Sequence, residues 1–402
     1  MDILADARAQ SGDLASLRHA LHRRPELGLH LPRTQDTVLE AIDSLGLEVS
    51  TGTSCSSVTA VLRGEAPGQD GTPRRVVLLR ADLDALPVSE DVAVDYRSQV
   101  DGVMHACGHD LHATMLVGAA RLLAAHRDRL EADVVFMFQP GEEGYDGAGR
   151  MIAEGVLDAA GRRADAAYAL HVLSNLSPRG TVTTRPGAIM AASDALTVTV
   201  TGRGGHAASP HLAADPIPAA CEMVLALPAA VGRGVDAFSP AVLTVGAFHA
   251  GTRRNIIPES VRFEATIRTV DPGVSALVAE LTRRTCAGIA AAHGVRVEVE
   301  LVGEYPVTVN HPGAVQAALE TSAELFGEQR FVSLPQPIAG SEDFSRVLAE
   351  VPGAMVFLGA SVDGVQPHLV AGNHSPQAAF DDRVLPDGAA LLAALALRPS
   401  GA

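Results

Sequence analysis

The spacing of hydrophobic residues in the first 180 positions alternates between that of helices and that of strands. Several strand segments, such as 74–84, are almost uninterrupted apolar runs, which is typical of parallel strands buried on both faces. The predicted elements are helices around 14–21, 38–45 and 110–126 and strands at 57–64, 74–84, 133–139 and 165–172. This alternation predicts an α/β domain in which a parallel or mixed sheet has helices on both faces.

The pattern changes near Thr181, where strands begin to alternate hydrophobic and polar residues, as strands with one solvent-facing side do. The elements predicted there are strand 195–201, helix 215–231, strand 241–248, strand 261–270, helix 275–293 and strand 295–302. The order βαββαβ is that of a ferredoxin-like α+β sandwich. After 302 the α/β pattern resumes with a strand at 354–358. We therefore predict a discontinuous domain of residues 1–180 and 303–402, with a ferredoxin-like domain of residues 181–302 inserted into it.

Composition and charge exclude several classes of function. The 402 residues contain 31 Lys and Arg against 47 Asp and Glu, a formal net charge of −16, so we expect no nucleic-acid partner. The sequence contains no lysine, which excludes a lysine nucleophile or Schiff base. The four cysteines show no CxxC spacing, the N-terminus does not resemble a signal peptide, and the longest apolar runs are short. We therefore expect a cytoplasmic protein with reduced thiols and no membrane partner.

Metal-binding side chains gather in the sequence MHACGHDLH at 104–112. Cys107 and His109 are separated by one glycine, which allows the backbone to bend sharply between them. The segment lies between buried strands, where a doubly wound sheet forms its ligand crevice. The alternative interpretation is the start of a helix that contains incidental histidines.

Two adjacent carboxylates, Glu142 and Glu143, follow a predicted buried strand in the sequence QPGEEG. They could simply stabilise the N-terminus of a helix through its dipole. Two neighbouring glutamates also raise each other's pKa unless a cation lies beside them. A metal ion would supply that cation, with one glutamate as its ligand and the other as the base that deprotonates a bound water.

Three further candidates lie at the ends of predicted strands. His171 is near the end of the strand at 165–172, and His374 lies in a turn that follows the strand at 354–358. Each could be a structural histidine, although α/β topology can bring such distant loops together. Asp82, near the end of an earlier apolar strand, could orient a metal-bound imidazole.

Eight segments, in the same order along the chain, resemble subfamily D of the M20 peptidases: RADLDALP, MHACGHDLH, QPGEEG, ALHV, GRGGHAASPH, NIIP, GSEDFS and GNHSP. That subfamily contains enzymes of the aminoacylase, hippurate hydrolase and indole-acetyl-amino-acid hydrolase types. The resemblance extends from His22 to Asp382 and includes the inserted domain. Eight motifs in one order are far more specific than any one of them.

The resemblance implies a site with two divalent metal ions and Glu142 as the general base. The implied metal ligands are Cys107, His109, Glu143, His171 and His374, and Cys107 could bridge the two ions. Thiolate and imidazole ligands suit zinc, with manganese, cobalt or nickel as alternatives. In the inserted domain, His206 and Asn255 would contact the substrate in the same chain or across a dimer, whereas their spacing alone indicates only hairpin turns.

We therefore expect a metal-dependent amidohydrolase that cleaves the amide bond of N-acyl amino acids. One alternative is a dipeptidase or carboxypeptidase of the same family. Another is a non-catalytic binding protein, which would have no need of a general base such as Glu142. Because the βαββαβ pattern leaves sheet edges that need covering, we also expect a homodimer formed through the inserted domain.

Overall fold

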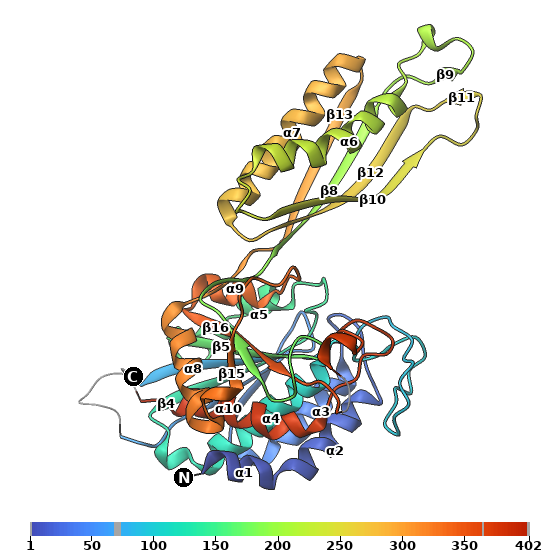
Figure 1. Ribbon diagram of the computed structural model, residues 1–402. Coiled ribbons are helices and arrows are strands. Elements are labelled where there is room, and N and C mark those ends of the chain that lie inside the picture. Colours follow the sequence, from blue (N-terminus) through green and yellow to red (C-terminus); the bar gives the residue numbers. More distant parts are fainter. Residues whose placement is uncertain (1, 68–73, 364–365, 400–402) are drawn as a thin grey trace. The chain divides into compact units, whose positions relative to one another are not determined.

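The computed structural model describes residues 2–67, 74–363 and 366–399 (Figure 1). The chain forms two compact units. The first unit contains three segments of the chain and the second contains two. Their bounds are Met1–Gly187, Val309–Pro335 and Asp343–Ala402 for the first, and Ala188–Thr308 and Gln336–Glu342 for the second.

An eight-stranded mixed sheet forms the centre of the first unit, in the order β1-β2-β4-β3-β5-β16-β6-β15. Its strands are β1 (Glu48–Thr51), β2 (Val58–Leu62), β3 (Arg75–Asp82), β4 (Ala132–Gln139), β5 (Ala166–Leu173), β6 (Val182–Thr184), β15 (Phe331–Ser333) and β16 (Gly353–Gly359). The four central strands β4, β3, β5 and β16 run parallel and are almost entirely buried, as their apolar runs predict. Their carboxyl ends therefore meet at one edge of the sheet.

Helices cover both faces of this sheet (Figure 1). They are α1 (Ile3–Ala9), α2 (Ser11–His22), α3 (Pro32–Ile42), α4 (His109–Ala125), α5 (Gly147–Ala153), α8 (Pro312–Phe326), α9 (Phe344–Glu350) and α10 (Leu385–Leu397). Helices α4 and α10 pack on one face, and α5 and α9 pack on the other. Alternate residues of β4, such as Phe136 and Phe138, lie in the same hydrophobic core as α4 and α10. The predicted mixed sheet with helices on both faces is confirmed.

The second unit is a four-stranded antiparallel sheet in the order β10-β12-β8-β13, with two helices packed against it (Figure 1). Its main elements are β8 (Ala192–Thr201), α6 (Pro216–Gly234), β10 (Ala241–Ala250), β12 (Ser260–Thr269), α7 (Pro272–His293) and β13 (Arg296–Tyr305). Two short two-stranded sheets pair β9 (Gly205–His206) with β11 (Ile256–Ile257) and β7 (Gly187–Met190) with β14 (Thr308–Asn310). The chain order and the strand order are those of the predicted ferredoxin-like sandwich.

The bounds of the second unit differ from the predicted range of 181–302. The unit begins later because β6 pairs with β16 and β15 in the sheet of the first unit. It ends later because β13 continues past residue 302. It also includes the segment 336–342, in which Ile338 exchanges backbone hydrogen bonds with Ile189 and Ala191. The segment is too short to show a hydrophobic pattern, so the sequence alone does not predict that it belongs to the second unit.

Within the described part of the chain, α6 is the one helix long and apolar enough to cross a membrane. This helix is longer and more apolar than the apolar runs on which the prediction of no membrane partner was based. One side of α6 packs on the antiparallel sheet through buried residues that include Ala219, Met223 and Leu227. The core helix of a domain meets the same criteria of length and composition.

Candidate metal centre

A glycine sets the positions of the first two candidate ligands. Gly108 has a φ of 86° and directly precedes α4. A Cβ atom at this position would lie 2.4 Å from Cγ2 of Val172, so a side chain would be excluded by space as well as by the backbone conformation. The sharp bend places Cys107 in the turn before α4 and His109 at the first residue of the helix.

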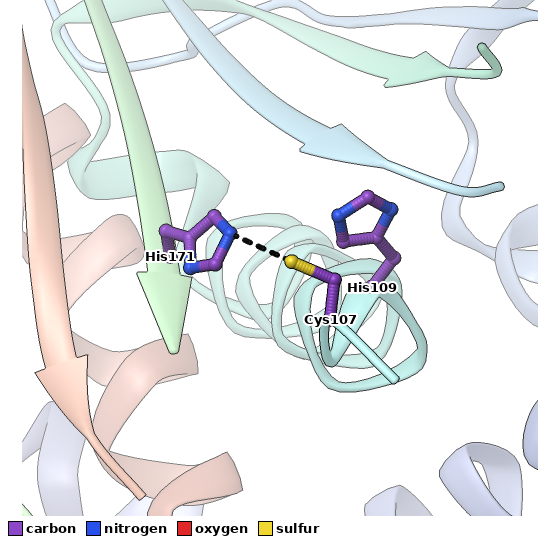
Figure 2. A group of neighbouring side chains, drawn as sticks. All are labelled: Cys107, His109 and His171. Carbon is purple, nitrogen blue, oxygen red and sulfur yellow. Dashed lines mark hydrogen bonds between the residues drawn. The ribbon is translucent and has the colours of Figure 1, made fainter. Parts of the chain in front are cut away.

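Cys107, His109 and His171 lie together at the carboxyl edge of the sheet (Figure 2). The sulfur of Cys107 lies 3.4 Å from Nε2 of His171, which belongs to β5. The other ring nitrogen of His171, Nδ1, lies 2.8 Å from the carbonyl oxygen of Val172 and must donate to it. Nε2 of His171 is therefore the nitrogen that can bind a metal, and it faces the thiol.

His109 is oriented in the same way by a backbone carbonyl. Its Nδ1 donates to the carbonyl oxygen of Asp84 over 2.8 Å, so Nε2 is the nitrogen that can give up its proton and bind a metal. This Nε2 atom is buried and has no hydrogen-bond partner among the described residues. Histidines that bind metals commonly donate their second nitrogen to a carbonyl or carboxylate. An unpartnered buried Nε2 beside a thiol and two glutamates fits a metal ligand.

The carboxylate of Asp84 also positions the two glutamates. The backbone N–H groups of Glu142 and Glu143 donate to its two oxygens over 2.9 and 3.0 Å. Asp84 therefore holds the loop after β4 with its side chain and His109 with its carbonyl group. His109 and both glutamates have ligand atoms within 4.8 Å of one another.

His374 reaches the site from the loop that follows β16. Its φ of 70° is in the left-handed region, and its N–H donates to the carbonyl oxygen of Ala106 over 2.9 Å. Nε2 of His374 lies 3.2 Å from Oε1 of Glu143. The neighbouring Asn373 ties this loop to the site, because its Nδ2 donates to the carbonyl oxygens of Cys107 and Val172 over 3.1 and 3.0 Å.

The side chains of the site shift one another's pKa values. Burial raises the pKa of the Cys107 thiol, but His171 and His109 outweigh burial and hold it well below its usual range. Burial lowers the pKa of His109, but Asp82 and Cys107 outweigh it and hold that pKa well above the usual range. Hydrogen bonds to Cys107 and Glu143 raise the pKa of His374 to about 10. The site thus favours a thiolate surrounded by cations, and a divalent ion could replace the protons.

Asp82 lies beside the candidate ligand His109, with its Oδ2 3.7 Å from Nε2 of that ring, but its hydrogen bonds go to other residues. Its Oδ1 lies 2.6 Å from Nδ1 of His112, and its Oδ2 accepts a hydrogen bond from Arg80. Nε2 of His112 accepts the N–H of Val172 over 2.8 Å, so His112 has both nitrogens occupied and is not available as a ligand. The residue that orients the candidate ligand His109 is Asp84, two positions further along the chain.

The predicted residues thus fall into two groups. Overlapping clusters bring together the six candidates of the first unit: Cys107, His109, Glu142, Glu143, His171 and His374. His206 and Asn255 belong to the second unit, where both are exposed. They are neighbours there, because β9 pairs with β11 and the N–H of Ala207 donates to the carbonyl oxygen of Asn255. The sequence did not single out Asn373, and it did not separate the role of Asp84 from that of Asp82.

The thiol of Cys107 provides a direct test of metal binding. We expect a small alkylating reagent to label Cys107 slowly in the metal-loaded protein and much faster after chelation, because a metal ligand is not free to react. Cys221, which is exposed in the single chain and belongs to the second unit, is the internal control. It lines the groove proposed below as a dimer interface, which contains no candidate ligand, so its labelling rate should be the same in both states. Mass spectrometry of the peptides measures both rates. Equal labelling of Cys107 in the two states would remove it from the ligand set.

Comparison with known proteins places this site in a family. The family model described as "Peptidase family M20/M25/M40" matches residues 78–398. The chain is 36% identical to thermostable carboxypeptidase 2 of Saccharolobus solfataricus, over 96% of this chain and 95% of that protein. It is 34% identical to the hippurate hydrolase of Campylobacter jejuni, over 99% of both chains.

A solved structure agrees with this relation. The YXEP protein of Bacillus subtilis, described as a dinuclear metal-binding peptidase from the M20 family, superposes with a TM-score of 0.82. The two chains are 29% identical, and the match covers 97% of this chain and 98% of that one. With a family match over most of its length, this chain is a metal-dependent hydrolase that belongs to peptidase family M20/M25/M40.

Proposed function

We propose that this hydrolase cleaves the amide bond of N-acyl amino acids and releases a carboxylic acid and a free amino acid. The observation that carries the proposal is the group of Cys107 and three histidines beside the adjacent pair Glu142 and Glu143. Such a set combines side chains that can hold divalent metal ions with a carboxylate left over for proton transfer. Similarity to a hippurate hydrolase over nearly the whole chain supports this substrate class, since hippurate is an N-acylated glycine.

The metal ions would be held by five residues: Cys107, His109, Glu143, His171 and His374. Two divalent ions, as in the M20 peptidase of Bacillus subtilis, would polarise the scissile carbonyl group and lower the pKa of the attacking water. Zinc suits the thiolate and imidazole ligands, with manganese, cobalt or nickel as alternatives.

Glu142 is the proposed general base. Its carboxylate removes a proton from the attacking water and later delivers a proton to the leaving amine nitrogen, so that the same group serves as base and then as acid. Asp84 supports this role by fixing the backbone N–H of Glu142. His206 and Asn255 of the second unit contact the substrate carbonyl or carboxylate in this proposal. Both are exposed and adjacent in the β9–β11 ribbon.

A carboxypeptidase or dipeptidase is the second candidate, because the chain is also similar to a thermostable carboxypeptidase. The two functions differ in the group on the acyl side of the bond, which is a simple acyl group in one case and an amino acid in the other. A panel of N-acetyl and N-benzoyl amino acids, measured beside matched dipeptides, separates them. Higher kcat/KM for the N-acyl compounds supports the proposal. Preference for dipeptides would replace it with the second candidate.

We also propose that the protein is a homodimer formed through the second unit. Edge strand β10 and helix α6 line an apolar groove with Cys221, Val224, Leu225, Val245 and Phe248. Leu225 is 77% exposed although α6 belongs to the core of the unit. An open edge strand beside an apolar helix face suits a second copy of the same surface, related by a twofold axis.

Light scattering should therefore give about twice the chain mass of 41.6 kDa. Leu225→Asp should yield a folded monomer, because it adds a charge to the groove at an exposed position. Val302→Asp is the matched control, since Val302 is 49% exposed on the opposite edge strand β13, and it should remain dimeric. A monomeric parent protein, or a dimer broken only by Val302→Asp, would refute this interface.

A further inference from the structure

A buried carboxylate, Asp343, holds both ends of the loop that carries Glu142. The loop leaves β4 at Gln139 and enters α5 just before Ala148. Nε2 of Gln139 donates to both oxygens of Asp343, over 2.8 and 2.7 Å. The backbone N–H of Ala148 donates to the same carboxylate over 2.9 Å. The start and the end of the loop are therefore tied to one side chain at the beginning of α9.

Arg80 completes this arrangement from the neighbouring strand β3. Its Nη2 donates to Asp343 over 2.9 Å, and its Nε donates to Oε1 of Gln139 over 2.9 Å. The side chain of Asp343 is fully buried and that of Arg80 is 2% exposed, so these bonds are made away from water. We call Arg80, Gln139 and Asp343 the brace. Each member bonds to the other two, which fixes their relative positions.

The brace continues toward the strand that carries His171. Nη1 of Arg80 donates to Asp82 over 2.7 Å, and the other oxygen of Asp82 bonds to His112. His112 accepts the N–H of Val172, the residue after His171. Continuous buried hydrogen bonds thus connect the end of β5, which carries the candidate ligand His171, with the loop that carries Glu142.

We propose that Asp343 and Arg80 are positioning residues that hold Glu142 where it can transfer a proton, an inference that rests on the proposed function. Neither residue is among the five proposed metal ligands. Both hold the loop, and a carboxylate oxygen of Asp343 also lies within 4.8 Å of a carboxylate oxygen of Glu142. The N–H of Gly147 donates to the carbonyl oxygen of Gly141, so the loop ends close on each other. With its ends fixed by the brace and its middle fixed by Asp84, the loop cannot shift without breaking buried hydrogen bonds.

The substitution Asp343→Asn tests the proposal, because it replaces one carboxylate oxygen by an amide NH2 group and changes little else. The four hydrogen bonds that Asp343 accepts from Arg80, Gln139 and Ala148 all come from N–H donors, so an amide nitrogen placed there faces a donor and breaks at least one of them. We expect kcat to fall about 100-fold, because a small displacement of a catalytic group has this effect, while KM changes less than about threefold. Metal content should equal that of the parent protein, since none of the five proposed ligands is changed.

Asp387→Asn is the matched control for the loss of a buried charge. Asp387 pairs with Arg330 over 2.6 Å in the same unit, on α10, which carries no candidate site residue. It should lower the melting temperature and leave kcat unchanged. If Asp343→Asn does not fold, Gln139→Met removes three hydrogen bonds of the brace without changing any charge, and kcat should fall by about tenfold or more at constant KM. Normal kcat in folded Asp343→Asn, or a loss explained by lost metal, would overturn the proposal.

A double-mutant cycle with Glu142→Gln separates this inference from the proposed function. If Asp343 acts through Glu142, adding Asp343→Asn to the Glu142→Gln protein should lower the residual kcat by less than about threefold. If the two substitutions lower kcat by independent factors that multiply, Asp343 does not act through Glu142. That result would overturn the positioning role of Asp343 and leave the role of Glu142 intact. An active Glu142→Gln single variant would overturn the proposed role of Glu142, and the brace would then have no base to position.

Discussion

Replacement of Glu142 by glutamine is expected to lower kcat by at least about a thousandfold while the metal content stays near that of the parent protein. Glutamine has nearly the same shape but cannot accept the proton of the attacking water, so the general-base and electrostatic contributions are lost together. The bond from Asp84 to this loop should survive the substitution, because Asp84 accepts the backbone N–H of residue 142.

Steady-state kinetics and elemental analysis of the same preparation measure both quantities. The appropriate background control is the double replacement of Glu142 and Glu143, which reveals any contaminating activity. Full metal content with a loss below about tenfold would show that another group accepts the proton. Loss of metal in this variant would identify Glu142 as a ligand.

Glu143→Gln is expected to have the second largest effect, by a different route. The carboxylate of Glu143 lies in one cluster with Cys107 and His374, and its Oε1 is 3.2 Å from Nε2 of His374. A neutral amide is a weaker ligand than a carboxylate for a divalent ion, so metal occupancy should fall and activity should fall with it. Burial and the neighbouring Cys107 raise the pKa of Glu143, while His374 opposes this rise.

Titration with excess metal distinguishes the two glutamates. Activity of the Glu143→Gln protein should rise with added metal toward a plateau, because weak binding can be overcome by concentration. Activity of Glu142→Gln should not respond to metal. Exchanged behaviour of the two variants would reverse the roles that we assign within the pair.

The fold could be predicted from the sequence because the two units bury their strands differently. Strands such as β3 and β4 are covered on both faces and appear as unbroken apolar runs, whereas β8 and β12 expose one face and alternate. The domain boundary was less predictable. β6 is only three residues long, and its place in the first sheet depends on pairing with β15 and β16, which are distant in sequence.

The candidate site was predictable to the extent that it depends on side-chain type and strand ends. Cys107 and His171 lie together because parallel strands bring their carboxyl ends to one edge. Hydrogen bonds to backbone groups were not predictable, since they depend on how loops fold. The sequence therefore favoured Asp82 as the orienting residue, whereas Asp84 supplies the carbonyl group, and it did not indicate the ties made by Asn373.

Asp84 binds His109 through its carbonyl group and the Glu142 backbone through its carboxylate. Because His109 and the Glu142 backbone are both hydrogen-bonded to Asp84, a thermal displacement of Asp84 moves them in the same direction. The distance between the candidate metal ligand and the proposed base should therefore fluctuate less than the position of either one. Thermal motion of the sheet at elevated temperature should therefore leave the distance between His109 and Glu142, on which proton transfer depends, nearly constant.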